Sequence, residues 1–426
     1  MSKGKPSTDA PSAGKPLLAR QPIFDPAGAV WGYELLFRSS DTNAYSHDDG
    51  DAATTALLDS SLNVLGLAGV AAGKRALLNF TRELLVTDMW RMLPRETAVI
   101  EVLETVKPDA EVIAACRRIR DAGYMLALDD VIDTPGIEPL IELADLIKVE
   151  FPAVKGPARR TLTESLAIRG LKLLAEKVET PEDHDEATRL GYHFIQGYFF
   201  CRPQIVLGRD IPIRKRNYLA LLRAVHEPEI DLKQVEAVIR QDVGLTTRLL
   251  RYLNSASFGL RTKMTTVHQA LVHLGTEPLR KWVSITAITS VSEDKPAALL
   301  TLSMARARLC ELVASAADGA AQPHDAFMVG MLSTLDALMD RPLDELLMEL
   351  TLPIDVKIAL LKADTPLGRL LQLACACERG ALDEALRRAE AMGVTPAALS
   401  GAQAQALQWA DEVTDAQTTT PATRAA

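Results

Sequence analysis

The stretch LALDDVIDTP, Leu126–Pro135, decides the fold expected for the first half of this 426-residue sequence. It begins with an apolar run that predicts a short buried strand. Two adjacent aspartates, Asp129 and Asp130, follow where that strand should end. Paired carboxylates at a strand end are typical of a metal or acid–base site. The stretch therefore predicts a sheet with a candidate site at its edge.

Seven further strand-like runs lie on either side of this one, before about residue 205. Helix-like stretches separate several of them, such as residues 109–123, where apolar residues fall on one face and Gly123 can end the helix. This repetition predicts a parallel α/β sheet or a βα barrel. Only residues 26–29 separate the first two runs, so we expect an antiparallel hairpin there. The runs are LLARQPIFD, VWGYELLF, ALLNF, AVIEVLE, LIKVE, LKLLAE and HFIQGYFF.

Polar side chains stand in or at the ends of these runs. In a βα barrel the carboxyl ends of the strands face one mouth, where catalytic residues gather. Carboxylate and amide oxygens are ligands that Mg²⁺ and Mn²⁺ prefer, and a lysine could neutralise the cluster or stabilise charge on a phosphoryl oxygen. The alternative is that these charges only pair with one another at a solvated rim. The residues are Glu34, Asn79, Glu101, Glu104, Asp129, Asp130, Lys148, Glu176 and Gln196.

From about residue 206 the strand signals give way to helical patterns. Asp231 is a plausible N-cap for a first amphipathic helix, and four leucines between Leu245 and Leu253 mark a second. We therefore expect an all-α second domain. The expected boundaries are a disordered tail at 1–16, a barrel domain at 17–204, a helical domain at 205–411 and a disordered tail at 412–426.

The composition excludes several classes of protein. A net charge of −9 argues against a nucleic-acid-binding surface, which usually needs a basic domain or stripe. Five scattered cysteines without a CxxC pair imply neither a disulfide framework nor a zinc site. No run approaches 18 apolar residues and the N-terminus lacks a signal peptide, so we expect no membrane span and a cytoplasmic protein.

The polar strand ends resemble, in order, the motifs of the EAL domain family of cyclic di-GMP phosphodiesterases, over roughly residues 17–204. The matching segments are YELLFR, LLNF, IEVLE, LALDD, LIKVE, LLAEKVET and FIQGYFFCRP. The resemblance implies a modified (βα)8 barrel with one antiparallel strand, which hydrolyses cyclic di-GMP to pGpG with Mg²⁺ or Mn²⁺. It implies metal ligation by Glu34, Asn79, Glu101, Asp129, Asp130 and Glu176, catalytic roles for Lys148 and Glu176, and cyclic di-GMP contacts by Arg38 and Gln196.

Residues 206 to about 400 resemble an HDOD domain, a helical relative of the HD phosphohydrolases, through segments 235–259 and 265–275. Where an HD enzyme carries His-Asp within a helix, this chain has Ser333 and Thr334. The neighbouring pair His324 and Asp325 stands without other clustered histidines. We therefore expect a non-catalytic helical domain that binds a protein partner, in a chain whose order resembles EAL–HDOD bacterial signalling proteins.

Departures from the EAL pattern favour loss of turnover. After the two aspartates, active members usually carry Phe-Gly-Thr-Gly, whereas this chain reads VIDTPG, in which Pro135 fixes φ. Lys177 replaces the glycine of Glu-Gly-Val-Glu-Thr, and Glu150 replaces an aspartate. These changes predict a signalling adaptor or cyclic di-GMP sensor with a degenerate, inactive EAL domain and low metal occupancy.

The alternative hypothesis is a working Mg²⁺- or Mn²⁺-dependent cyclic di-GMP phosphodiesterase, because every expected metal ligand is retained. The sequence also leaves open whether the chain forms homodimers.

Overall fold

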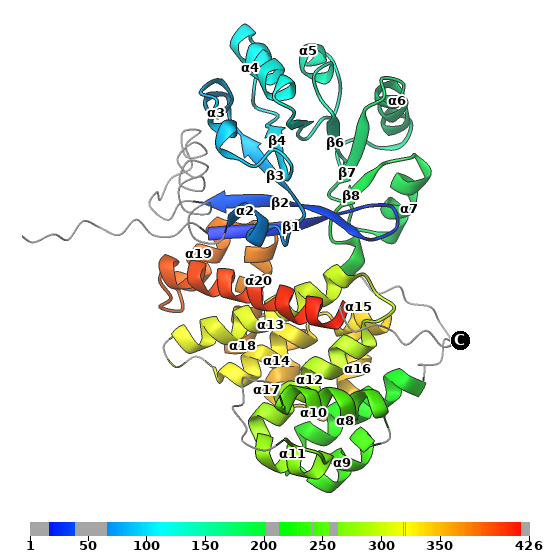
Figure 1. The fold of residues 1–426 in the computed structure, drawn as a ribbon, viewed down its shortest axis with the longest axis vertical. Helices are drawn as coiled ribbons and strands as arrows, with labels where there is room; N and C mark the ends of the chain where they lie inside the picture. The colour runs from blue at the N-terminus through cyan, green and yellow to red at the C-terminus, as the bar shows by residue number, and fades with distance from the viewer. Residues whose placement is uncertain are drawn as a thin grey trace, which may run out of the picture.

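The computed structural model describes residues 17–38, 66–201, 213–227, 229–240, 242–254, 263–317, 319 and 321–418. They form a barrel followed by a region of helices (Figure 1). The expected tail at 1–16 and the end of the expected tail at 412–426 lie outside these residues.

Eight strands close the barrel in chain order. The first strand, β1, runs antiparallel to both of its neighbours, β2 and β8, and every other neighbouring pair is parallel. The expected hairpin and the expected barrel with one antiparallel strand are thereby confirmed. The strands are β1 (Leu17–Phe24), β2 (Val30–Arg38), β3 (Arg75–Phe80), β4 (Ala98–Val102), β5 (Met125–Leu128), β6 (Leu146–Glu150), β7 (Lys172–Glu176) and β8 (Phe194–Gln196).

Apolar side chains fill the barrel interior below the mouth, so this is a packed core and no pore. They come from seven strands: Ile23, Leu77, Val99, Ala127, Leu146, Leu174 and Phe194. Outside, helices alternate with the strands: α2 (Gly66–Val70), α3 (Arg82–Val86), α4 (Ala110–Asp121), α5 (Glu138–Ile141), α6 (Gly156–Ala167) and α7 (Pro181–Arg189), with short 3₁₀ turns at Met89–Met92 and Phe199–Cys201. The expected helix at 109–123 is α4.

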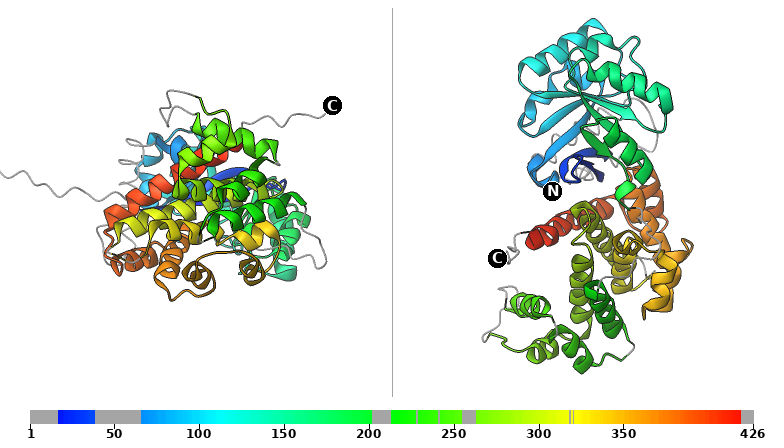
Figure 2. Two further views of the ribbon diagram at one scale, coloured as in Figure 1. Left: turned by 90° about the horizontal axis from the view of Figure 1, so that it is seen from below. Right: turned by 90° about the vertical axis from the view of Figure 1, so that its right-hand side faces the viewer.

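The second region is all helical, as expected (Figure 2). The carboxylate of Asp231 accepts a hydrogen bond of 2.8 Å from the backbone N–H of Lys233, which confirms the predicted N-cap. The helices are α8 (Ile213–His226), α9 (Leu232–Arg240), α10 (Val243–Leu253), α11 (Val267–Leu274), α12 (Thr276–Val291), α13 (Ala297–Ala316), α14 (Pro323–Leu332), α15 (Leu335–Met339), α16 (Leu343–Glu349), α17 (Ile354–Leu361), α18 (Pro366–Glu378), α19 (Leu382–Glu390) and α20 (Pro396–Thr418).

Helix α20 corrects one expected boundary, because it continues to Thr418 where we expected a tail from residue 412. The composition of this segment is tail-like, but its inner face has partners. Val413 packs against the helical core, and the hydroxyl of Thr414 lies 3.1 Å from that of Thr301 on α13. Tertiary packing therefore outweighs weak local helix propensity here.

The barrel and the helical region share one hydrophobic core. Leu17, Ala19 and Phe24 on β1 belong to the cluster that fills the helical region. The Arg20 guanidinium also donates to both carboxylate oxygens of Asp411 on α20, at 2.7 and 2.8 Å. The expected division at residue 205 stays a prediction, since residues 202–212 lie outside the described part of the chain.

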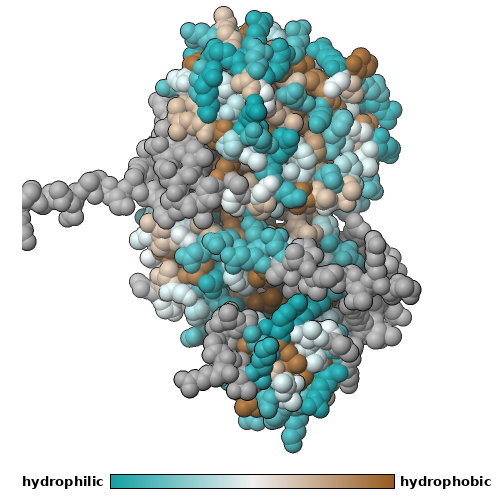
Figure 3. All heavy atoms as spheres, viewed as in Figure 1, coloured by the Kyte–Doolittle hydropathy of each residue, from teal (hydrophilic) through white to brown (hydrophobic). Residues whose placement is uncertain are grey.

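Within the described residues, no helix combines the length and the apolar character that a bilayer span requires. Hydrophilic and hydrophobic side chains are mixed over the face seen in Figure 3.

Candidate metal site

The ammonium group of Lys148 lies at the centre of the barrel mouth. It is 2.8 Å from an oxygen of Asp129, 2.8 Å from one of Glu176 and 3.6 Å from one of Glu34, and it donates to Glu101. Glu101, Asp129 and Glu176 lie at or next to the carboxyl ends of β4, β5 and β7, and Glu34 lies in the middle of β2. Neighbouring strands of the barrel thus bring them to one place, as the sequence predicted.

This cluster is buried, and burial changes its protonation. Lys148 and Glu101 are fully buried, and Glu176 is 5% exposed. Burial raises the pKa of Glu176 to about 8 and also raises that of Glu101, although Lys148 opposes both shifts. Burial also acts to raise the pKa of Asp129, but the charge of Lys148 and hydrogen bonds with Glu101 and Lys148 outweigh burial and lower this pKa. One ammonium therefore compensates the cluster only in part.

Several buried oxygens at the mouth lack a hydrogen-bond partner. They are Oδ1 of Asn79, Oε2 of Glu101, Oε2 of Glu176 and Oε1 of Gln196. Buried oxygens without a donor are costly, and a divalent cation satisfies carboxylate and amide oxygens directly. The residues present therefore fit a hard divalent cation such as Mg²⁺ or Mn²⁺.

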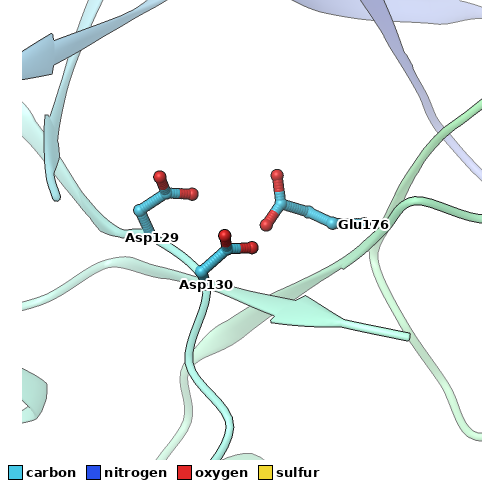
Figure 4. Close-up of side chains that lie close together, drawn as sticks. All are labelled: Asp129, Asp130 and Glu176. Atoms are coloured by element: carbon cyan, nitrogen blue, oxygen red, sulfur yellow. The ribbon is translucent and has the colours of Figure 1, made fainter. Parts of the chain in front are cut away.

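Asp129, Asp130 and Glu176 also meet a geometric criterion for a metal site. One ligand oxygen from each lies within 4.8 Å of the other two. Their carboxylates point toward one another across the mouth (Figure 4). In the part of the chain that the structure describes, this is the one such group of three or more acidic, histidine or cysteine side chains.

The other residues expected at the site are Gln196, Glu104 and Arg38, and the structure places each of them differently. Gln196 lies at the mouth, where its amide donates to Glu34 at 2.6 Å. Glu104 is exposed, outside this cluster. Arg38 ends β2, but its side chain lies outside the described residues.

Comparison with known proteins extends over both parts of the chain. The HDOD domain family model matches residues 211–340. Cyclic di-GMP phosphodiesterase CdgJ of Vibrio cholerae is 36% identical over 359 residues, which cover 84% of this chain and 83% of that protein. The uncharacterized protein YuxH of Bacillus subtilis is 34% identical over 364 residues, covering 84% of this chain and 89% of YuxH. This chain belongs to the EAL–HDOD family.

Solved structures of EAL proteins match less than half of this chain. An EAL domain protein from Listeria monocytogenes is 21% identical, with a TM-score of 0.35, and the match covers 44% of this chain and 87% of that one. The PaMucR phosphodiesterase in complex with c-di-GMP is 20% identical, with a TM-score of 0.37 and coverage of 47% and 99%.

Lys177, which stands where other EAL sequences have glycine, reaches into this EAL mouth. Its ammonium group lies 3.1 and 3.2 Å from the two oxygens of Asp130 and 3.1 Å from an oxygen of Glu150. Hydrogen bonds with both carboxylates raise the pKa of Lys177, although partial burial opposes the shift. Lys177, which departs from the EAL sequence pattern, therefore provides the cation that pairs with Asp130.

The backbone explains why glycine suits this position. Lys177 has φ +54°, in the left-handed region that costs a residue with Cβ about 1 kcal/mol or more. Asp130 has φ +43°, which aspartate tolerates better than most residues. The two ion-pair partners are therefore both held in left-handed conformations at the mouth.

Within its described residues, the HDOD region has no comparable group of three or more acidic, histidine or cysteine side chains that could hold a metal ion. The Ser333 hydroxyl donates to the Gly330 carbonyl at 2.7 Å and accepts from Arg306 at 3.1 Å, while Thr334 is buried. His324 lies near the ring of His226, with 6.3 Å between ring centroids. Sequence reasoning had not connected these two histidines, because 98 residues separate them in the chain.

Gln21 is a residue of the mouth that sequence reasoning missed. It lies on β1 directly opposite Glu34, and its side-chain oxygen accepts a hydrogen bond of 3.0 Å from Gln196. Paired positions of a hairpin face the same side, but the register shift between Ile23 and Phe24 is needed to pair Gln21 with Glu34, so the sequence held no usable signal.

Proposed function

We propose that this protein is a cyclic di-GMP signalling adaptor, in which the EAL barrel binds the dinucleotide together with a divalent cation and hydrolyses it slowly or not at all. Its HDOD region would bind a protein partner. The inference follows the family membership and the chemistry of the barrel mouth.

The ion pair between Lys177 and Asp130 is the observation that carries this proposal. Phosphodiester displacement by two metal ions needs both ions about 3.5–4 Å apart, held by shared carboxylates. Asp130 already has a cationic partner in the ammonium of Lys177. A second cation would have to displace that ammonium, so we expect the mouth to favour binding over turnover.

The other residues of the mouth suit recognition of a phosphodiester. A divalent cation, when bound, would polarise a phosphoryl oxygen and lower the pKa of a water molecule. We assign Glu34, Asn79, Glu101, Asp129 and Glu176 to holding that cation. The ammonium of Lys148 then provides positive charge for a phosphate oxygen.

An apolar stripe on α17 supports the proposed protein partner. Ile354, Ile358 and Leu361 are 67%, 36% and 56% exposed, and their spacing of four and three residues places them on one helix face. Exposed apolar stripes of this kind are typical of protein contacts. A homodimer is one form that such a contact could take.

A working cyclic di-GMP phosphodiesterase is the second candidate. It is favoured by the unsatisfied oxygens of Asn79, Glu101 and Glu176, which leave a cation site open beside Lys148. The Vibrio cholerae relative, which is named a cyclic di-GMP phosphodiesterase, supports the same assignment.

Incubation of the purified protein with Mn²⁺ and cyclic di-GMP distinguishes the two candidates. The adaptor proposal expects saturable binding by calorimetry and little pGpG by chromatography. Multiple-turnover pGpG formation that disappears in Glu34→Ala would establish the phosphodiesterase instead. Absence of binding at high micromolar dinucleotide, with and without Mn²⁺, would contradict both.

A further inference from the structure

Helix α18 ends against the barrel, beside the mouth. Carbonyl groups in the last turn of a helix have no donor within the helix. Here two barrel side chains donate to carbonyls at this end. The Tyr198 hydroxyl donates to the carbonyl of Glu378 at 2.9 Å, and the Gln21 amide donates to the carbonyl of Arg379 at 3.1 Å. The helical region thus uses its own backbone to contact residues beside the candidate metal site.

Three hydrogen bonds connect this contact to Glu34. The first joins the Arg379 carbonyl to Nε2 of Gln21. The second joins Oε1 of Gln21 to Nε2 of Gln196 at 3.0 Å, and the third joins the same Nε2 to Oε2 of Glu34 at 2.6 Å. A backbone group of the helical region is therefore two side chains away from an expected metal ligand.

The chemistry of the groups allows one orientation of this chain. An ionised carboxylate only accepts hydrogen bonds, so Gln196 must turn its NH₂ group toward Glu34. The second N–H of that group then meets Gln21, which must present its oxygen. The NH₂ group of Gln21 consequently faces the Arg379 carbonyl, which also only accepts. Rotating either amide by 180° would place two acceptors or two donors together.

The turn after α18 is held closely against the barrel. Gly380 has φ +73°, and a Cβ added there would lie 2.4 Å from Cδ1 of Leu36 on β2. That separation is below van der Waals contact, so an alanine here would have to displace the end of the Leu36 side chain and would also strain the backbone at a positive φ. The position of the Arg379 carbonyl relative to Gln21 is therefore set by the packing of β2.

We propose that Gln21 is a positioning residue through which the helical region sets the orientation of the Glu34 carboxylate, and thereby the affinity of the barrel mouth for a divalent cation. This inference rests on the proposed metal site. It adds a route by which a partner that shifts the α18–α19 turn changes ligand binding in the barrel.

Calorimetric titration of the full-length protein with Mn²⁺ tests this route. Gln21→Met keeps the side-chain length but removes both hydrogen bonds, and we expect the Kd for Mn²⁺ to rise about five-fold. Gly380→Ala moves the turn away and should raise the Kd similarly. The double variant should be no weaker than the weaker single variant, because both changes break one chain.

Asp411→Asn is the matched control. It weakens a different polar contact between the two regions, the one with Arg20, whose side chain points to the opposite face of β1 from that of Gln21. We expect an unchanged Kd. An unchanged Kd in Gln21→Met would overturn the inference, as would an equal rise in Asp411→Asn.

A metal-free measurement separates failure of this inference from failure of the proposed function. If the unmodified protein binds no Mn²⁺, the metal site is refuted, and the hydrogen-bond chain is judged by NMR of ¹⁵N-glutamine-labelled protein. The Gln196 amide signal, assigned by its loss in Gln196→Met, should shift in Gly380→Ala but not in Asp411→Asn. An unshifted signal in Gly380→Ala refutes the chain.

Discussion

At the barrel mouth four carboxylates surround the buried ammonium of Lys148, whereas in the helical region the buried His226 is held neutral. Burial lowers the pKa of His226 to about 3, with the charges of His324 and Arg280 adding to the shift, and its Nε2 lies 3.1 Å from the Ser284 hydroxyl. The mouth thus keeps charged groups in the protein interior, and a buried charge is stable only when an opposite charge lies next to it. The helical region avoids buried charge at His226. The two sites therefore differ in how they bury ionisable groups: the mouth retains charges that a bound cation can compensate, whereas His226 loses its charge.

The largest expected effect comes from Lys148→Met, which removes the compensation at the mouth. Removing one partner of a buried ion pair typically costs about 3–5 kcal/mol. We expect a loss of this size in metal-free protein, measured by urea unfolding, with partial recovery in Mn²⁺. Lys215→Met, which breaks the Lys215–Asp294 pair in the helical region, is the control and should cost less than about 1 kcal/mol. Equal losses of stability in both variants would show that the charge of Lys148 is no more important to folding than that of Lys215.

Acid should destabilise the helical region through His226. Its folded pKa lies below the unfolded value near 6.5, so between these values the unfolded state binds the extra proton and stability falls as the pH falls. The slope is at most ~1.4 kcal/mol per pH unit. Unfolding at pH 7.5 and 5.5 should show this loss, and His226→Gln should reduce it. An unaltered pH dependence in His226→Gln would show that folding does not lower the pKa of His226.

Lys177→Gly should strengthen cation binding at the mouth. The half-exposed ion pair with Asp130 is worth about 1 kcal/mol at most, so its loss should increase Mn²⁺ affinity up to roughly five-fold. Calorimetry measures the affinity, and pGpG formation shows whether turnover also rises. Lys177→Met removes the charge but keeps the strained backbone, so a gain restricted to Lys177→Gly would assign the effect to φ and not to the ammonium.

The smallest effect on ligand binding is expected for Ser333→Ala in the helical region. Its hydroxyl bonds Arg306 and a carbonyl within its own helix, so we expect a stability loss of about 1 kcal/mol and unchanged Mn²⁺ and dinucleotide binding. Metal content measured after dialysis against Mn²⁺ should also be unchanged. A fall in metal content would reveal a second metal site and remove the contrast between the two regions.

The residue pattern predicted a parallel α/β sheet or a βα barrel that begins with an antiparallel hairpin, with polar residues gathered at one edge, and the resemblance to EAL domains favoured the barrel. This was possible because strand periodicity and short connections are local, and because parallel strands must bring their carboxyl ends to one edge. Glu101, Asp129 and Glu176 are far apart in the chain, yet their positions at or next to the ends of parallel strands were sufficient to bring them together. Helix α20 was cut short in the prediction because its end is stabilised by contacts with α13 and β1.

The role of Gln21 was decided only by tertiary structure. The β1–β2 hairpin has a register shift between Ile23 and Phe24, and this shift places Gln21 opposite Glu34. Counting outward from the turn without the shift would pair Gln21 with Tyr33, whose side chain points to the other face. A bulge of one residue leaves little trace in an apolar pattern, yet it exchanges the two faces of a strand.

Local pattern therefore determined which residues of this protein stand at strand ends. Three-dimensional packing decided which other groups contact the mouth. Lys177 forms an ion pair with Asp130, and Gln21 donates a hydrogen bond to the Arg379 carbonyl after α18. The physical reason is that strand spacing is set by the backbone, whereas the reach of a lysine or glutamine depends on neighbours that are distant in sequence.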